Sequence, residues 1–245
     1  MTANGSSARF PFEPLAARWE SSLHVEPLTA AAVHAWLIKI DEGLRSSSEH
    51  LLSEAEMRRA AAFKFARDRT QFVVARACLR LFLGKYTGQP PQEIEFAYGE
   101  YGKPYLETGR SRPLQFNLSH SGDYAVAAFA VDQEVGVDIE QHAADSLDEG
   151  LLTFCFTESE RTKYDQAFEG ERTNIFFDTW ARKEAYMKFV GDGLNIEANK
   201  LDIAAREKEI SITDLPQIHG YSAAIATNTK PVEVRCYDFA SSNMM

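Results

Sequence analysis

The 245-residue sequence has few cysteines, no long apolar run and no excess of basic residues. Its three cysteines (Cys78, Cys155 and Cys236) are far apart and form no CxxC pair, which argues against a disulfide framework or a zinc site and favours the reducing cytosol. No run of 18 apolar residues and no export signal are evident, so we expect a cytoplasmic protein without a membrane span. The formal net charge of −10 disfavours a general nucleic-acid binder.

The chain does have enough apolar residues, 44%, to bury one sizeable core or two small ones. Turn-forming segments separate the apolar ones and predict mixed α and β structure throughout. The short polar link at residues 132–134 is the expected boundary between two halves. A loose arm is expected at residues 1–14.

Hydrophobic spacing predicts the individual elements. In the first half we expect a strand within 19–25, helices over 29–40, 53–63 and 66–86, and two strands within 114–131. The strand from residue 124 is apolar on both faces and should lie inside a sheet. In the second half we expect a strand over 135–140, helices near 147–152, 158–168 and 174–190, and a tail rich in strands.

Basic residues are concentrated between residues 58 and 85, a segment that contains eight of them and only one acid, Asp68. Within the long helix, Arg69, Arg76 and Arg80 share one line, which predicts a ridge of cations. A solvated helix face is the ordinary explanation for such a run. The imbalance inside an acidic chain nevertheless favours an anionic ligand.

Two acidic residues share one face of the strand over 135–140, because side chains alternate along a strand and Asp138 and Glu140 are two apart. An exposed acidic strand end would fit this fragment equally well. A third acid, Glu184, lies within the apolar stripe of the helix over 174–190 and rarely would be left there without a partner.

Two partners for Glu184 are open: an ion pair with Lys188 one turn on, or a metal ion shared with the two strand acids. Because Glu184 is not on the polar side of its helix, we favour the metal. Three carboxylates without His or Cys suit Mg²⁺ or Mn²⁺.

Further groups could bind phosphate. Lys103 is held in a turn before Pro104, and FNLSHSGD at residues 116–123 offers hydroxyls, an imidazole and a glycine turn. Ser119 and His120 are adjacent on a strand and diverge, so they cannot form a serine hydrolase pair. The segment from Thr157 to Glu160 fits a capping box, which explains it without any catalytic role.

Four segments in order, FNLSHSGD, VGVDIE, FTESE and WARKEAYMKFVGDGL, resemble the motifs of 4'-phosphopantetheinyl transferases of the Sfp (surfactin synthetase activating) type. The resemblance implies an α/β (α+β) fold of two similar, pseudo-twofold-related halves, residues 1–133 and 134–245, with coenzyme A in the cleft between them. It also implies Mg²⁺-dependent transfer of the 4'-phosphopantetheine arm to a serine of an apo acyl or peptidyl carrier protein, with release of adenosine 3',5'-bisphosphate.

Carried over by position, the resemblance implies that Asp138, Glu140 and Glu184 hold Mg²⁺ at the pyrophosphate and that Lys188 pairs with a phosphate oxygen. Glu160 or Glu184 would accept the serine proton, and both stay open. The residues expected at the adenosine 3'-phosphate end are Arg67, Lys103, Pro104, Ser119 and His120.

Three other functions compete with this one: a coenzyme A or nucleotide sensor without catalysis, a metal-dependent phosphodiesterase, and a structural partner of a synthase complex. A monomer that binds neither nucleic acid nor membrane is expected. The sequence leaves open which carrier protein is modified and whether acyl-coenzyme A is accepted.

Overall fold

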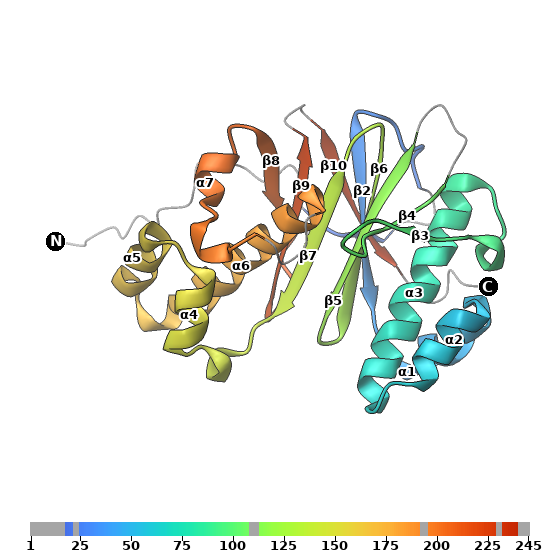
Figure 1. Cartoon of the computed structure of the whole chain (residues 1–245), viewed down its shortest axis with the longest axis horizontal. Helices are drawn as coiled ribbons and strands as arrows, with labels where there is room; N and C mark the ends of the chain where they lie inside the picture. Colours follow the sequence, from blue (N-terminus) through green and yellow to red (C-terminus); the bar gives the residue numbers. More distant parts are fainter. Residues whose placement is uncertain (1–17, 22–24, 108–112, 192–195, 229–231, 240–245) are drawn as a thin grey trace.

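The computed structural model describes residues 18–21, 25–107, 113–191, 196–228 and 232–239, so the arm expected at residues 1–14 lies outside it. The predicted mixed α/β architecture is confirmed. Two β-sheets face each other, and a long helix covers the outer face of each (Figure 1). Within the described residues, no helix combines the length and the apolar character needed to cross a bilayer.

The larger sheet has five strands in the order β1-β10-β2-β6-β5. The bounds are β1 Glu20–Ser21, β2 Ala32–Lys39, β5 Leu114–Ser121, β6 Tyr124–Val131 and β10 Glu233–Phe239. β10 is parallel to both β1 and β2, and the β2–β6 and β6–β5 pairs are antiparallel. As predicted, β6 lies inside the sheet.

The smaller sheet is antiparallel, in the order β7-β9-β8. Its strands are β7 Val135–Gln141, β8 Ile210–Asp214 and β9 Tyr221–Asn228. A separate hairpin pairs β3 Ala97–Tyr98 with β4 Pro104–Tyr105. The predicted boundary at residues 133–134 falls between β6 and β7. The division into two halves stays a prediction, because β10 comes from the second half of the sequence but pairs in the larger sheet with strands of the first half.

The helices are α1 Glu42–Ser48, α2 Glu54–Ala61, α3 Ala66–Thr87, α4 Glu149–Cys155, α5 Glu158–Gln166, α6 Glu169–Val190 and α7 Ile203–Arg206. Short 3₁₀ turns include η1 Glu49–Leu51, η2 Pro91–Glu93, η3 Ala144–Ser146 and η5 Ala198–Lys200. The helices predicted over 53–63, 66–86 and 158–168 are confirmed, with shifts of at most two residues at their ends. The helix predicted over 174–190 is confirmed as well, but it begins five residues earlier, at Glu169.

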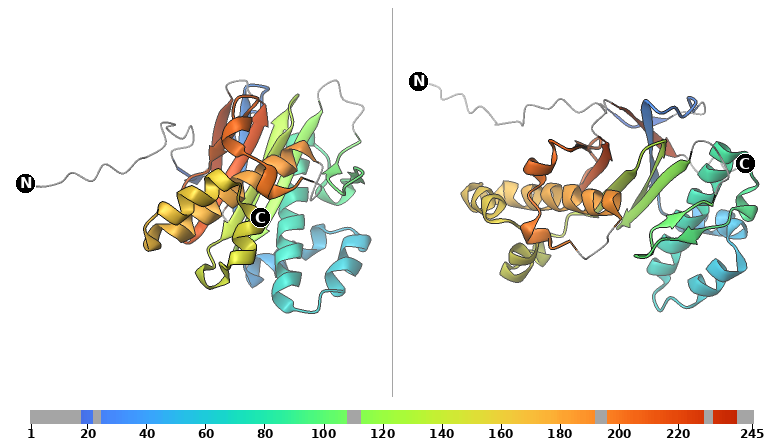
Figure 2. Two further views of the ribbon diagram at one scale, coloured as in Figure 1. Left: turned by 60° about the vertical axis from the view of Figure 1, so that its left-hand side comes forward. Right: turned by 45° about the horizontal axis from the view of Figure 1, so that its top comes forward.

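The two long helices, α3 and α6, are each 22 residues long and lie on opposite sides of the paired sheets (Figure 2). Each ends at a glycine in the left-handed region, Gly88 with φ 76° and Gly191 with φ 84°. A left-handed residue after the last helical turn satisfies otherwise unpaired carbonyls, and glycine takes that conformation without steric cost.

The helix predicted over residues 29–40 is wrong, because this segment forms β2. The spacing of Val33, Trp36, Leu37 and Ile40 fits a helix, but the residues between them, apart from the exposed Lys39, are buried as well. β2 lies between β10 and β6, and both of its faces are covered: Trp36 packs toward α3, and Val33 packs toward the smaller sheet. A strand buried on both faces has a continuous apolar run, in which helical spacing appears by chance.

Candidate active site

A glycine on β7 lets α6 lie directly against the strand. A Cβ added to Gly136 would lie 2.1 Å from the carbonyl oxygen of Ala185 and 2.3 Å from the amide nitrogen of Phe189. Only glycine permits so close an approach between backbones. The acids of β7 that share its face are thereby brought next to the polar residues near the C-terminal end of α6.

Three side chains from three elements form a closed hydrogen-bonded group. The hydroxyl of Ser119 on β5 donates to Oδ1 of Asp138 at 2.7 Å. The ammonium of Lys188 on α6 donates to the same Oδ1 at 2.6 Å and to the Ser119 hydroxyl at 2.8 Å. Asp138 is buried, and burial raises its pKa, an effect that the charge of Lys188 opposes.

The charge of Asp138 affects the other two acids, Glu140 and Glu184. Glu140 accepts hydrogen bonds from Ser121 at 3.1 Å and from the indole of Trp180 at 3.2 Å. Burial, followed by the charge of Asp138, raises the pKa of Glu140 to about 7. Burial and Asp138 also raise the pKa of Glu184. The charge of Asp138 therefore acts on both of the other carboxylates predicted from sequence.

The predicted magnesium site is not shown. Among the residues that the structure describes, no three His, Cys, Asp or Glu side chains are gathered so as to hold a metal ion. The ion pair of Asp138 is instead with Lys188, at 2.6 Å. The donor chemistry nonetheless fits a hard cation, because Oδ2 of Asp138 is buried without a hydrogen-bond partner and the neighbouring donors are carboxylate oxygens.

Glu160, one of the two predicted proton acceptors, is held by its surroundings. It completes the predicted capping box of α5, where its carboxylate accepts from the amide of Thr157 at 2.8 Å. The same carboxylate lies 2.6 Å from the ammonium of Lys183, which is fully buried and also donates to the carbonyl oxygens of Cys155 and Ala198. Burial lowers the pKa of Lys183, and the Glu160 charge opposes that shift.

The residues predicted at the 3'-phosphate end are dispersed. Lys103 lies 3.0 Å from Glu134 and donates to the carbonyl of Phe189 at 3.4 Å, near the C-terminal end of α6. Pro104 is opposite Tyr98 in the β3–β4 hairpin.

Ser119 belongs to the Asp138 group, whereas the exposed Arg67 lies 3.5 Å from Asp123 in the β5–β6 turn. Burial, followed by the charge of Lys188, lowers the pKa of His120. Ser119 and Lys188 thus meet at Asp138, and Arg67 and Lys103 are tied to other partners.

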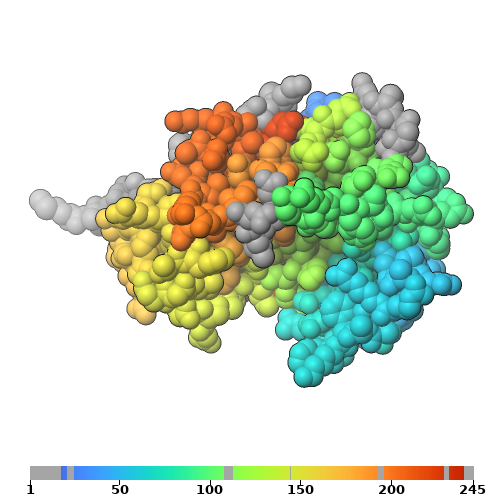
Figure 3. Space-filling view, viewed as in Figure 1, coloured from blue at the N-terminus to red at the C-terminus, as the bar shows by residue number. Residues whose placement is uncertain are grey.

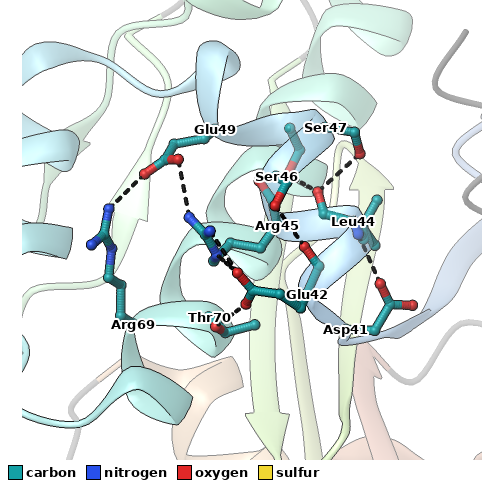
Figure 4. Close-up of polar contacts among 10 residues, drawn as sticks. Asp41, Glu42, Leu44, Arg45, Ser46, Ser47, Glu49, Arg69 and Thr70 are labelled. Atoms are coloured by element: carbon teal, nitrogen blue, oxygen red, sulfur yellow. Dashed lines mark hydrogen bonds and ion pairs between the residues drawn. The ribbon is translucent and has the colours of Figure 1, made fainter.

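The predicted ridge of cations on α3 is wrong in part. Arg80 is only 2% exposed and binds Glu56 at 2.7 Å together with the carbonyls of Pro91 and Ile94. Arg69 donates to Glu49, which also accepts from Arg45, in a network that joins α1 and η1 to α3 (Figure 4). These arginines therefore hold neighbouring elements together and do not form a free ridge. The sequence spacing showed that they share one line on the helix, but it could not show which elements pack over that line.

Sequence reasoning missed two residues that organise this region, Lys183 and Asn117. Asn117 on β5 accepts a hydrogen bond from the amide of Val137 on β7. A signal was present: Asn117, Ser119 and Ser121 alternate along β5 with the same period of two that identified the acids of β7. Lys183 could have been noticed as a charge on the apolar face of α6, because it follows Phe176 by seven residues and precedes Met187 by four.

The surface is hollowed between the block of α1 to α3 and the region of α4, with atoms of the intervening strands at the bottom of the hollow (Figure 3). β5 and β7, which contribute Ser119 and Asp138, belong to these strands. The acid and lysine group therefore lies where the two sheets meet.

Comparisons with known proteins agree along the chain. A family model described as "4'-phosphopantetheinyl transferase, N-terminal" matches residues 44–132, and one described as "4'-phosphopantetheinyl transferase superfamily" matches residues 134–234. The chain is similar to the 4'-phosphopantetheinyl transferase HetI of Nostoc sp., with 34% identity over 185 residues that cover 74% of this chain and 78% of the relative. A 4'-phosphopantetheinyl transferase of Bacillus subtilis is 26% identical over 188 residues, 76% of this chain and 77% of the relative.

Among solved structures, a holo-(acyl-carrier-protein) synthase from Bacillus anthracis in complex with CoA (3',5'-ADP) is 25% identical. The match covers 41% of this chain and 95% of the solved chain, with a TM-score of 0.34. That score is too low for the likeness to bear on the fold.

Proposed function

This chain belongs to the 4'-phosphopantetheinyl transferase family, and we propose that it transfers the 4'-phosphopantetheine arm of coenzyme A to a serine of an apo acyl or peptidyl carrier protein. Adenosine 3',5'-bisphosphate is the leaving product. The observation that carries the proposal is the closed group of Ser119, Asp138 and Lys188 where the two sheets meet, in segments matched by the two family models.

The charges of this group suit phosphoryl transfer. Transfer from coenzyme A builds negative charge on the pyrophosphate, and a cation held in place before the reaction stabilises that charge. Lys188 is such a cation, since Asp138 and Ser119 both fix its ammonium. In our proposal Lys188 binds a pyrophosphate oxygen, and Asp138 keeps the lysine oriented.

Magnesium is part of the proposal. Asp138, Glu140 and Glu184 would hold the ion, and it would supply positive charge at the pyrophosphate. The orphaned Oδ2 of Asp138 supports this assignment, because a buried carboxylate oxygen without a hydrogen-bond donor is suited to a cation.

We assign the acceptance of the serine proton to Glu184 and not to Glu160. Glu160 is occupied by the buried Lys183 and by the amide of Thr157. Proton abstraction needs a carboxylate within hydrogen-bond reach of the serine hydroxyl, which in this proposal approaches the pyrophosphate at Lys188. Glu184 shares the electrostatic environment of Asp138 and Lys188 and meets this need better.

The finer features follow the same proposal. Arg67, Lys103, Pro104 and His120 contact the adenosine 3'-phosphate end of coenzyme A, and the presence of both matched halves in one chain supports the Sfp type. Ser119 is placed with Asp138, so we assign it to the pyrophosphate and not to the 3'-phosphate. The protein acts as a cytoplasmic monomer.

The test is the mass of the carrier. The protein is incubated with coenzyme A, Mg²⁺ and apo carrier proteins from fatty acid, polyketide and peptide synthesis, and each carrier is weighed. A gain equal to the phosphopantetheine arm on at least one carrier is expected. Coenzyme A binding without any mass gain would instead indicate a sensor, and hydrolysis of a generic phosphodiester without a carrier would indicate a phosphodiesterase.

A further inference from the structure

The seam between the two sheets is held by side chains of β5. In the described part of the chain, β5 and β7 are edge strands of different sheets. The side chains of β5 that face β7 are Asn117, Ser119 and Ser121, and all three make hydrogen bonds to it. Polar side chains on one strand thus take the place of a backbone ladder between the sheets.

Asn117 makes the bond at the N-terminal end of this row. Its Oδ1 accepts the amide hydrogen of Val137 at 3.1 Å, and both groups are buried. On its other side β7 pairs with β9, with Val137 opposite Ile225. A buried amide that loses its acceptor is destabilising, so the bond to Asn117 holds β7 at one point.

That point is directly before Asp138. Two residues along β5, the next side chain on the same face is Ser119, which donates to Asp138 at 2.7 Å. At the other end of the acidic segment, the amide of Gln141 donates to Ser121 at 3.0 Å. The acids of β7 are therefore held between two fixed backbone positions, and a shift of one residue would turn them to the opposite face.

We propose that Asn117 is a positioning residue for the transfer reaction. By accepting the Val137 amide it sets the register of β7 on β5, and this register places Asp138 where Ser119 and Lys188 both reach Oδ1. The inference rests on the proposed function. Asn117 is the informative member of the row, because Ser119 and Ser121 also contact the acids themselves.

The experiment compares two replacements of similar volume. Asn117→Asp keeps an oxygen acceptor for the Val137 amide, and Asn117→Leu removes it. The matched control is Val73→Ala, which leaves a cavity in the buried cluster of α2 and α3 and loses stability away from the seam. For each variant, kcat and KM for the carrier are measured at saturating coenzyme A and Mg²⁺, below the melting transition.

We expect Asn117→Leu to lower kcat about tenfold or more, because misplacing a reacting group by about 1 Å can cost a hundredfold. KM for the carrier should stay unchanged. Asn117→Asp should recover most of kcat, and Val73→Ala should keep the wild-type kcat in its folded molecules. Faster amide hydrogen exchange at Val137 in the Leu variant, but not in the control, should accompany the loss.

Three results would overturn the proposal. One is a wild-type kcat in folded Asn117→Leu, and another is an equal loss in the Asp and Leu variants. The third is an equal loss in Val73→Ala, which would trace the effect to stability alone. A wild-type protein that modifies no carrier would refute the proposed function itself, a failure distinguishable from these three because it precedes any substitution.

Discussion

Replacing Glu160 by glutamine separates its structural role from a catalytic one. Lys183 is fully buried, and its ammonium has three acceptors: Glu160 at 2.6 Å and the carbonyls of Cys155 at 2.7 Å and Ala198 at 2.6 Å. Only Glu160 carries an opposite charge. Glutamine at this position still closes a capping box, so Glu160→Gln removes the charge and leaves the cap.

The magnitude follows from the burial. Removing one partner of a buried ion pair costs about 3 to 5 kcal/mol, because the remaining charge stays without compensation. Two carbonyls and the new amide still accept from Lys183, so we expect the lower end, about 3 kcal/mol. Thr157→Ala, which removes only the N-cap side chain of α5, should cost about 1 kcal/mol. The double variant Glu160→Gln with Lys183→Met should recover part of the loss, since no unpaired charge remains.

The assay is urea unfolding followed by circular dichroism, with turnover measured on the folded protein. For a slope of about 3 kcal/mol per molar, a loss of 3 kcal/mol moves the urea midpoint by about 1 M. Folded Glu160→Gln should keep most of the wild-type kcat, whereas loss of a general base lowers kcat by about a hundredfold or more. A variant with the wild-type midpoint and no turnover would refute this reasoning and return Glu160 to the reaction.

Three further predictions concern other parts of the molecule. Burial lowers the pKa of His34 to about 4 from 6.5, so the folded state favours the neutral imidazole. The free energy of unfolding therefore has its full His34 contribution above pH 6.5 and loses about 3 kcal/mol as the pH falls to 4. His34→Phe should flatten this pH dependence in urea titrations. Gly136→Ala should push α6 from β7 and cost about 3 kcal/mol or more, whereas Gly170→Ala, where an added Cβ meets nothing within 4 Å, should leave the melting temperature unchanged or raise it. Asp138→Asn should lower the rate of transfer by about a hundredfold or more while keeping the fold. Mg²⁺ should raise the melting temperature of the wild type but not of this variant. An equal rise in both proteins would show that Asp138 is not a metal ligand.

Local patterns predicted local structure well. The capping box at Thr157, the long helices and the β5–β6 hairpin all depend on contacts between residues close in sequence. The alternation that placed Asp138 and Glu140 on one face of a strand is equally local, and in the structure the charge of Asp138 acts on both Glu140 and Glu184. Such features can be predicted because a few neighbouring residues determine them.

Features that depend on distant partners could not be predicted in the same way. β2 was interpreted as a helix because β10 and β6, which bury both its edges, are far away in the sequence. Arg80 was expected on an exposed ridge because nothing local shows that residues 91–94 lie over it. The contact of Glu160 with Lys183 likewise joins two motifs, FTESE and WARKEA, that sequence reasoning had treated separately.

The position of β10 has a consequence for biosynthesis. This strand, at residues 233–239, lies between β1 and β2 and forms the parallel partner of both. While the ribosome is still adding residues before 233, one edge of β2 has no neighbour, and an apolar strand with open amides invites aberrant association. The sheet built mostly from early residues can therefore close only after translation has passed residue 239, and chaperones that shield nascent chains are expected to protect β2 until then.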